Sequence, residues 1–405
     1  MIMSKGTRFL LFSLATLMDM VASTMLFVAP IRAAQLGASY SVSAAQGVAW
    51  SLGAASMVLL GRYVTPRNAG SICIAACFLQ AGIRIALIIF ARTPTGMLGF
   101  LFAAGMTHAM FFTPYQVFFK AAESSRKLPL AVSVAIYTFA WSVGVSLGPL
   151  WSGFLIRETL GSIQGWQLCL LFTAVVLVFM GFAICVIKRR QFSHVVPDSD
   201  AAENARPDFA KVAWFAALCG GFAFSMVRGI FPAGAVKIGL PENILGGVLF
   251  TVGIIQALSA LFLSRILFWM YRPRILASAG LLGVTGMACF LTAFLGVLPD
   301  AWLTPAFFIG ALMFGLYTGS FYFYTVYHCL AHPNRAGTNI AMNECMLATS
   351  NVIGLLLGGA VADIYGINSP FLMAAVLIIL FTTVQVKRHS RAPWPRPLSP
   401  IAEQG

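Results

Sequence analysis

Charged residues are scarce in this chain. They make up 9% of its 405 residues, whereas about a quarter of the residues in an ordinary soluble domain are charged. Hydrophobic residues make up 59%, so the composition excludes an ordinary soluble fold and indicates a protein embedded in a lipid bilayer. The net charge of +14 does not indicate a nucleic-acid partner, because nearly all of the basic residues flank long apolar segments.

Sequence motifs for catalysis and for nucleotide or metal binding are also missing. The chain has no Gly-rich phosphate loop of the Walker type, so we do not expect it to couple to ATP hydrolysis. HExxH, paired CxxC and nucleophile-elbow motifs are absent. The eight cysteines lie in or at the ends of apolar segments, as small buried residues do. We therefore predict no enzymatic activity, no cofactor and no metal site.

Long apolar windows take the place of such motifs, and each can supply the ~20 residues that a membrane helix needs. Glycine and proline interrupt the windows, which favours helices over the short alternating strands of a barrel. The predicted spans are 9–34, 44–64, 69–91, 95–120, 129–156, 166–187, 211–236, 243–266, 275–298, 301–329, 336–361 and 368–386. The sequence thus predicts an all-α membrane protein with twelve transmembrane helices.

Basic residues gather at alternate ends of these spans. Most of the 26 Lys and Arg fall on the side of the N-terminus, and only Arg32, Arg92, Arg157 and Lys237 fall at the opposite ends of spans. The positive-inside rule then predicts that both termini are cytoplasmic. We expect a multi-pass protein of the bacterial cytoplasmic (inner) membrane.

A repeat divides the chain into two halves. One helix face formed by His108, Phe112, Tyr115 and Phe119 recurs about 210 residues later as Tyr317, Phe321, Tyr324 and His328, and Gly144 and Gly148 recur as Gly354 and Gly358. Parallel repeats at half the chain length are typical of transporters whose substrate site lies between the halves. We predict a six-helix bundle over 1–187, a cytoplasmic linker over 188–210, a second six-helix bundle over 211–386 and a disordered cytoplasmic tail over 387–405, with pseudo-symmetry between the bundles.

Ionisable residues inside the spans are functional candidates, because a charge in the bilayer is costly unless it is paired or faces water. Asp19 and His108 lie at similar depth on two helices, and Glu344 is a second buried carboxylate. We predict that these three residues handle protons. Arg84 is interpreted as a side chain that snorkels to the outer surface. Arg228 could either snorkel outward or meet an anionic group of a substrate.

Aromatic residues crowd the span at 301–329. Such a stripe is usually packing, but each tyrosine hydroxyl inside the bilayer needs a partner or water. We therefore predict an aromatic wall that contacts the substrate together with Arg228. The wall consists of Phe112, Tyr115, Tyr317, Phe321 and Tyr324.

Three short segments resemble motifs of the major facilitator superfamily. Gly144, Gly148-Pro149 and Gly153 resemble the antiporter motif of its fifth span, with Ser152 in place of one glycine. The turn from Gly61 and Arg62 to Arg67 resembles the loop motif between its second and third spans, and Gly165-Trp166-Gln167 resembles the start of its sixth span. Thr65 replaces an acidic residue of the loop motif, and Asn68 replaces a glycine. These replacements question whether the loop still locks an inner gate by charge.

The resemblance implies a secondary transporter in which spans one, four, seven and ten line a central cavity. It implies proton-coupled export of a small drug-like molecule or metabolite by alternating access, in a monomer whose partners are the substrate, protons and lipid. Two alternatives remain open. The chain could import a metabolite as a proton symporter or facilitator, or it could be a non-transporting membrane sensor or assembly factor.

Overall fold

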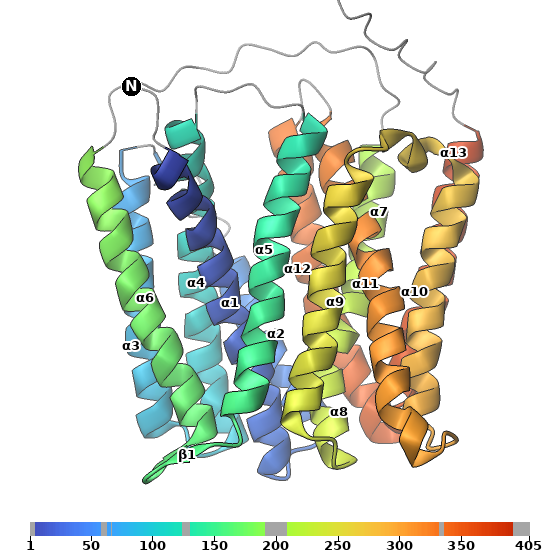
Figure 1. The fold of residues 1–405 in the computed structure, drawn as a ribbon, viewed down its shortest axis with the longest axis horizontal. Coiled ribbons are helices and arrows are strands. Elements are labelled where there is room, and N and C mark those ends of the chain that lie inside the picture. Colours follow the sequence, from blue (N-terminus) through green and yellow to red (C-terminus); the bar gives the residue numbers. More distant parts are fainter. Residues whose placement is uncertain are drawn as a thin grey trace, which may run out of the picture.

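The computed structural model describes residues 5–57, 63–65, 67–123, 130–190, 209–331 and 336–391. These residues form a bundle of long, roughly parallel helices (Figure 1). The N-terminal half contains α1 (Lys5–Gln35), α2 (Tyr40–Ser56), α3 (Ala69–Phe90), α4 (Pro94–Glu123), α5 (Leu130–Leu155) and α6 (Gly165–Arg190). A small antiparallel hairpin of β1 (Thr159–Leu160) and β2 (Ile163–Gln164) joins α5 to α6.

The C-terminal half repeats this order of helices, and one of its membrane-length helices is irregular. Its elements are α7 (Ala210–Ser225), the π-helical η2 (Met226–Ile230), α8 (Phe231–Lys237), α9 (Glu242–Leu263), the 3₁₀ helix η3 (Leu267–Tyr271), α10 (Pro273–Phe294), α11 (Asp300–Leu330), α12 (Ala336–Tyr365) and α13 (Ser369–Ser390). The segments α7, η2 and α8 follow one another without a break and cross the bundle as one helix.

Eleven helical stretches of the described residues are long and apolar enough to cross a membrane. The remaining helix, α2, has 17 residues, and residues 58–62 after it are not described. Together these twelve helices confirm the predicted all-α architecture and the order of its spans. Helix α6 continues to Arg190 and α13 to Ser390, so both run a few residues into the predicted linker and tail. The rest of those two segments lies outside the described residues.

Both halves pair their helices in the same way. In the N-terminal half α1 packs on α5, α2 on α4, and α3 on both α4 and α6; in the C-terminal half α7 packs on α12, α9 on α11, and α10 on both α11 and α13. Two contacts, α5 with α9 and α2 with α12, make up most of the interface between the halves. A cavity between the halves is therefore bounded by these two helix pairs.

The end of the bundle away from the N-terminus, here called the far end, holds several polar contacts that join the halves. The Asp363 carboxylate of α12 accepts hydrogen bonds from the backbone N–H groups of Tyr40 (2.7 Å) and Ser41 (3.0 Å) at the start of α2. Glu242 of α9 pairs with Arg157 at 3.2 Å. It also accepts a hydrogen bond from the Gln35 amide at 3.2 Å. These contacts close the bundle at the far end.

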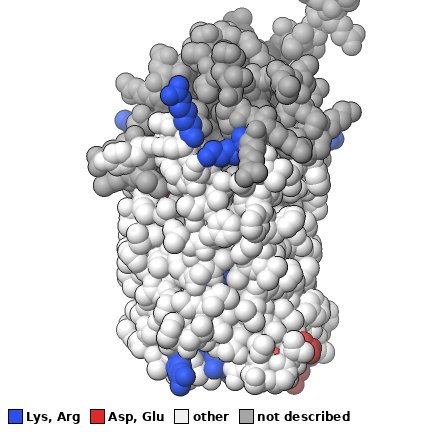
Figure 2. All heavy atoms as spheres, turned by 90° about the vertical axis from the view of Figure 1, so that its left-hand side faces the viewer, with Lys and Arg blue, Asp and Glu red and all other residues white. Residues whose placement is uncertain are grey.

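The surface matches a membrane setting. On the face seen in Figure 2, charged atoms lie toward the two ends and the band between them is almost free of charge. Many large apolar side chains on the helices are exposed in the isolated chain, for example Val175, Phe179 and Leu380. Exposed apolar side chains in such a band face lipid rather than water, so the protein is an integral, multi-pass membrane protein.

Candidate functional site

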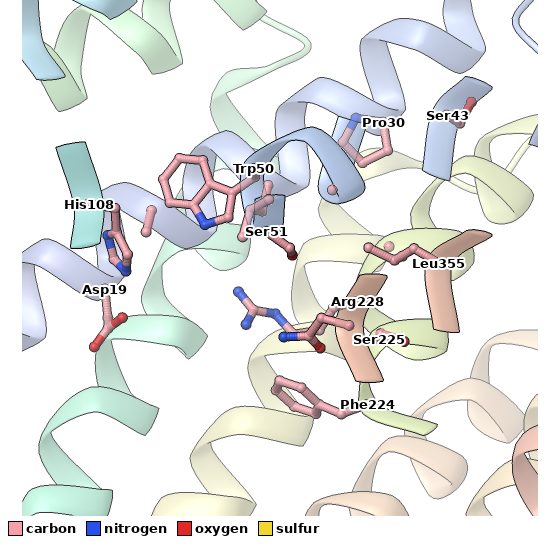
Figure 3. Close-up of a pocket in the computed structure, with 15 residues that line it drawn as sticks. Asp19, Pro30, Ser43, Trp50, Ser51, His108, Phe224, Ser225, Arg228 and Leu355 are labelled. Carbon is pink, nitrogen blue, oxygen red and sulfur yellow. The ribbon is translucent and has the colours of Figure 1, made fainter. Parts of the chain in front are cut away.

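A chamber with a volume of about 160 Å³ lies between the two halves. Both halves contribute to its wall, which Figure 3 shows in close-up. From the N-terminal half come Asp19, Ala22, Leu26, Pro30, Ser43, Gly47, Trp50, Ser51 and His108. From the C-terminal half come Phe224, Ser225, Arg228, Gly229, Asn351 and Leu355. The structure thus brings together three of the predicted site residues, which are Asp19, His108 and Arg228.

Asp19 is held in the chamber by close packing of α1 on α5. A Cβ atom added to Gly144 would lie only 2.9 Å from the Asp19 Cβ and would overlap the Thr16 carbonyl oxygen. On either side of Asp19, the Thr16 hydroxyl donates to the Ala140 carbonyl (3.0 Å) and the Ser23 hydroxyl to the Gly144 carbonyl (3.2 Å). The Oδ2 atom of Asp19 is buried and has no hydrogen-bond partner among the described residues. The carboxylate is thus fixed in place and available to bind a proton or a ligand.

His108 of α4 points into the same chamber as Asp19 (Figure 3). Its ring lies between those of Trp50 and Phe112, at centroid distances of 5.1 and 4.8 Å. The buried Nδ1 atom has no hydrogen-bond partner among the described residues. Aromatic packing thus holds the imidazole while leaving one nitrogen available, and this arrangement suits a group that relays protons.

Arg228 lies in the π-helical segment η2, and the sequence explains why the helix widens there. Pro232 has no backbone N–H, so it cannot donate to the Arg228 carbonyl four residues earlier. The Phe231 N–H instead donates to the Met226 carbonyl five residues earlier, which is the π-helical pattern. Such single π turns are frequent at functional sites. The Arg228 guanidinium extends into the chamber, 5.2 Å from the ring centroid of Phe224.

Glu344, the third predicted proton-handling residue, does not line the chamber. It lies seven residues before Asn351 on α12, so it occupies the same helix face, about 10 Å closer to the N-terminal end of the bundle. Its side chain is exposed, and its charge interacts with Tyr322, which also interacts with Arg228. Glu344 therefore lies on the α12 face that continues from the chamber toward the N-terminal end of the bundle.

The predicted aromatic wall lies outside the chamber. Phe112 packs on the His108 ring, and the Tyr115 hydroxyl donates to the Leu11 carbonyl. Inside the C-terminal half, Tyr317 stacks on Phe321 at 6.1 Å. Tyr324 packs against His389. Their contact with a substrate remains a prediction.

Trp50 and Phe224 also line the chamber, and neither is among the site residues predicted from the sequence. Trp50 sits next to the glycine- and serine-rich run of α2, and Phe224 precedes Arg228 by one helical turn. Proximity to Arg228 in a helical register is therefore the signal that would have identified Phe224.

Arg84 differs from the sequence interpretation. It does not snorkel: its side chain is 0% exposed, and it donates hydrogen bonds to the Thr173 hydroxyl and the Gln80 side-chain oxygen, both at 3.1 Å. Asp363 near the end of α12 also finds its partners on another helix, because its carboxylate accepts from the first N–H groups of α2 in the other half. In both cases acceptors or donors from distant helices satisfy the charge.

The glycines of the segment that resembles the antiporter motif contact two different helices. Gly144 and Gly148 lie against α1, whereas a Cβ atom on Gly153 would lie 3.2 Å from the Cα atoms of Asn243 and Gly246 in α9. Pro149 faces α9 as well, since a Cβ atom on Gly246 would overlap its carbonyl oxygen. In the C-terminal half, Gly354 and Gly358 lie against α7 and η2. These residues allow close helix packing around the chamber.

The loop motif after α2 is described only in part. Gly61 and Arg62 lie outside the described residues, whereas Arg67 lies in a turn before α3. In that turn the Asn68 side-chain oxygen accepts from the Thr65 N–H at 2.7 Å, and its amide donates to the Tyr63 carbonyl at 2.9 Å. Asn68 therefore stabilises a turn for which the family motif uses a glycine. A gating role for Gly61, Arg62 and Arg67 remains a prediction.

Comparisons with known proteins agree with this architecture. A family model described as Major Facilitator Superfamily matches residues 9–347. Among solved structures, the fold is similar to that of a bacterial homologue of the human lysosomal transporter Spinster in an inward-facing, unoccupied conformation. That match has a TM-score of 0.72 and 12% identity, and it covers 97% of this chain and 100% of the other. The fold is also similar to that of the E. coli fucose:proton symporter FucP, with a TM-score of 0.59, 13% identity and coverage of 95% and 98%.

Sequence comparison adds no relative with an assigned function. No curated protein matches the chain, and identities of 12% and 13% show a shared fold and nothing finer. Among the described residues, no group of three or more His, Cys, Asp or Glu is placed to hold a metal ion. The function is therefore inferred from the residues of the chamber.

Proposed function

The chain belongs to the major facilitator superfamily, a family of membrane transporters and not of enzymes, and on this premise we propose that it is a proton-coupled secondary transporter of a small organic molecule. The observation that carries the proposal is the central chamber between the halves, in which the Asp19 carboxylate has an oxygen without a hydrogen-bond partner among the described residues. An ionised carboxylate at this depth is costly unless it is paired or hydrated. Asp19 therefore favours a bound proton whenever the chamber closes.

Alternating access supplies the transport cycle. In this fold class, transporters rock one bundle against the other around a fixed central site. The far end is closed here by Asp363 and Glu242, and Glu344 is exposed on the chamber face of α12. This arrangement supports an inward-facing state, the conformation in which the Spinster homologue was solved. Opening the far end requires that the carboxylates of Asp363 and Glu242 leave their partners on the N-terminal half.

We assign Asp19 as the proton carrier and His108 as the group that relays protons to it. Glu344 lies on the exposed path from the cytoplasmic side and delivers or receives protons there. The antiporter-like segment around Gly144 and Gly148 favours export of the substrate in exchange for protons. Import together with protons is the second candidate, because the same chamber serves either direction and FucP, a protein of the same fold, is a proton symporter.

The test is a flux measurement in proteoliposomes with an imposed pH gradient and a chemically diverse substrate panel. We expect a pH-driven flux with the wild type, and we expect Asp19→Asn to reduce it to the level of protein-free vesicles, because an amide cannot carry a proton. Exchange of labelled for unlabelled substrate without a gradient should persist in Asp19→Asn. The sign of the gradient that drives uptake distinguishes export from import.

Asp300→Asn is the matched control, since Asp300 is exposed at the far end and lies away from the chamber. Full pH-driven flux in Asp19→Asn would contradict the proton role. The absence of flux for every panel member would instead favour a non-transporting sensor or assembly factor.

A further inference from the structure

We propose that the substrate is a small organic anion, a monocarboxylate no larger than about a benzoate, whose carboxylate binds the guanidinium of Arg228. This inference rests on the proposed transport function and adds the chemical class of the substrate. It follows from three features of the chamber, which are the unsatisfied donors of Arg228, the position of Asp19 on the opposite wall, and the size of the chamber.

Arg228 carries five N–H donors and no acceptor. Among the described residues its guanidinium forms no hydrogen bond and no ion pair, and its only close contact of defined geometry is the ring of Phe224. In Figure 3 the guanidinium extends toward the open chamber, on the side of Asp19 and His108. A cation inside a membrane protein is costly without an acceptor. A planar carboxylate supplies two acceptors that match the fork of the guanidinium.

Asp19 does not fill this position. Its charge interacts with that of Arg228, but the two residues form no ion pair, and they belong to opposite halves of the protein. When Asp19 binds a proton, Arg228 remains as the positive group of the chamber beside a neutral carboxylic acid. A monoanionic substrate bound together with that proton makes the loaded chamber electrically neutral, which lowers the cost of enclosing it in the bilayer. This loading corresponds to import together with protons, the second candidate above; in an exchange of substrate for protons, the anion binds Arg228 after the proton has left Asp19. A cationic substrate would instead meet the uncompensated charge of Arg228.

The chamber volume favours a small substrate in this state. An engineered protein cavity of about 150 Å³ holds one benzene molecule, and the chamber measures about 160 Å³. Pockets for drug-sized ligands run from about 300 Å³ upward. Trp50 and Phe224 supply apolar walls, while Asn351 and Ser225 add polar groups to the lining. The lining therefore fits one carboxylate on a small aliphatic or aromatic body.

The inference is tested by calorimetric titration of the purified full-length protein with acetate and benzoate. Acetamide and benzamide are matched neutral probes of nearly the same shape. We expect at least one carboxylate to bind and its amide to bind at least tenfold more weakly, since the amide loses charge-assisted hydrogen bonds. Arg228→Gln should weaken carboxylate binding at least tenfold, and Arg228→Lys should weaken it less. Asp19→Asn should bind the carboxylate as tightly as the wild type or more tightly.

Size-exclusion elution and thermal unfolding of each variant show whether it is folded. If Arg228→Gln does not fold, Arg228→Lys still tests the inference. Equal binding of acids and amides, failure of both acids to bind, or unchanged binding in Arg228→Gln would each overturn the inference. Failure of transport is distinguishable from these outcomes. Carboxylate binding at Arg228 without flux in vesicles would refute the proposed transport. A pH-driven flux of neutral or cationic panel members alone would leave transport intact and refute the anion site.

Discussion

The two halves pack glycines beside their polar groups in different ways. In the N-terminal half, a Cβ atom added to Gly144 would meet the Thr16 carbonyl of the α1 backbone, and one added to Gly148 would meet the Ser23 hydroxyl and then the Met20 carbonyl oxygen at 2.6 Å. In the C-terminal half the nearest atoms to Gly354 and Gly358 are side-chain atoms. They are the Ser225 hydroxyl for Gly354, and the Met226 sulfur and methyl group and the Ile230 Cδ1 for Gly358.

This difference separates a rigid wall of the chamber from an adjustable one. At Gly144 the backbones of α1 and α5 are in direct contact, which leaves little room for α1 to shift beside Asp19. The contact of α12 with η2 is made through side chains that can rotate, and η2 is itself an irregular turn of helix. We infer that Asp19, the proposed proton carrier, lies on the fixed wall and that Arg228, the proposed substrate ligand, lies on the wall that adapts.

The largest expected effect comes from adding one methyl group to the rigid contact. Gly144→Ala should destabilise the protein by about 3 kcal/mol or more, because overpacking costs about 1–3 kcal/mol even where side chains can move, and here the obstacle is the Thr16 carbonyl. Gly358→Ala is the matched variant, and it should cost less than about 1.5 kcal/mol, because Met226 is flexible. Thermal and denaturant unfolding in detergent measure both. Equal losses of unfolding free energy in the two variants would show that the two walls do not differ in rigidity.

A smaller effect is expected at Gly354, where a second substitution tests whether a side chain or the backbone limits the contact. Gly354→Ala should cost about 1–2 kcal/mol, because its Cβ atom would overlap the Ser225 hydroxyl. Ser225→Ala removes that hydroxyl, so the double variant should recover most of the loss. The same unfolding measurements give the coupling energy. An additive loss would show that the backbone of α7, and not the side chain, limits this contact.

Much of the fold, but only part of the site, can be predicted from the sequence. Apolar runs identify the spans because about 20 apolar residues in a row is a local signal, and isolated charges mark Asp19 and Arg228 in the same way. The faces of helices are a different matter. Nothing local shows that Tyr317 and Tyr324 point into the C-terminal half, because that depends on how α11 packs on its neighbours.

Tertiary partners also decide the role of Arg84. Its distance from the end of α3 suggested a snorkelling side chain, yet acceptors from α6 and from its own helix hold it inside the N-terminal half. The π turn at η2 could have been anticipated from Pro232, since the missing N–H is a property of the sequence. The direction of the turn into the chamber could not have been anticipated, because it depends on the contact of α12 with η2.

The smallest expected effect concerns the far end, where the C-terminal half provides the carboxylates and the N-terminal half the donors. Asp363→Ala removes two hydrogen bonds at the start of α2, and the loss of a helix cap costs about 1 kcal/mol. We expect the ratio of closed to open far ends to fall about fivefold. Spin labels at Leu160 and Val297, both exposed at this end, should then show a larger population of long distances. Asp300→Ala removes an exposed carboxylate at the same end and should leave the distances unchanged. If Asp363→Ala also leaves them unchanged, contacts of α5 with α9, rather than the cap on α2, hold the far end closed.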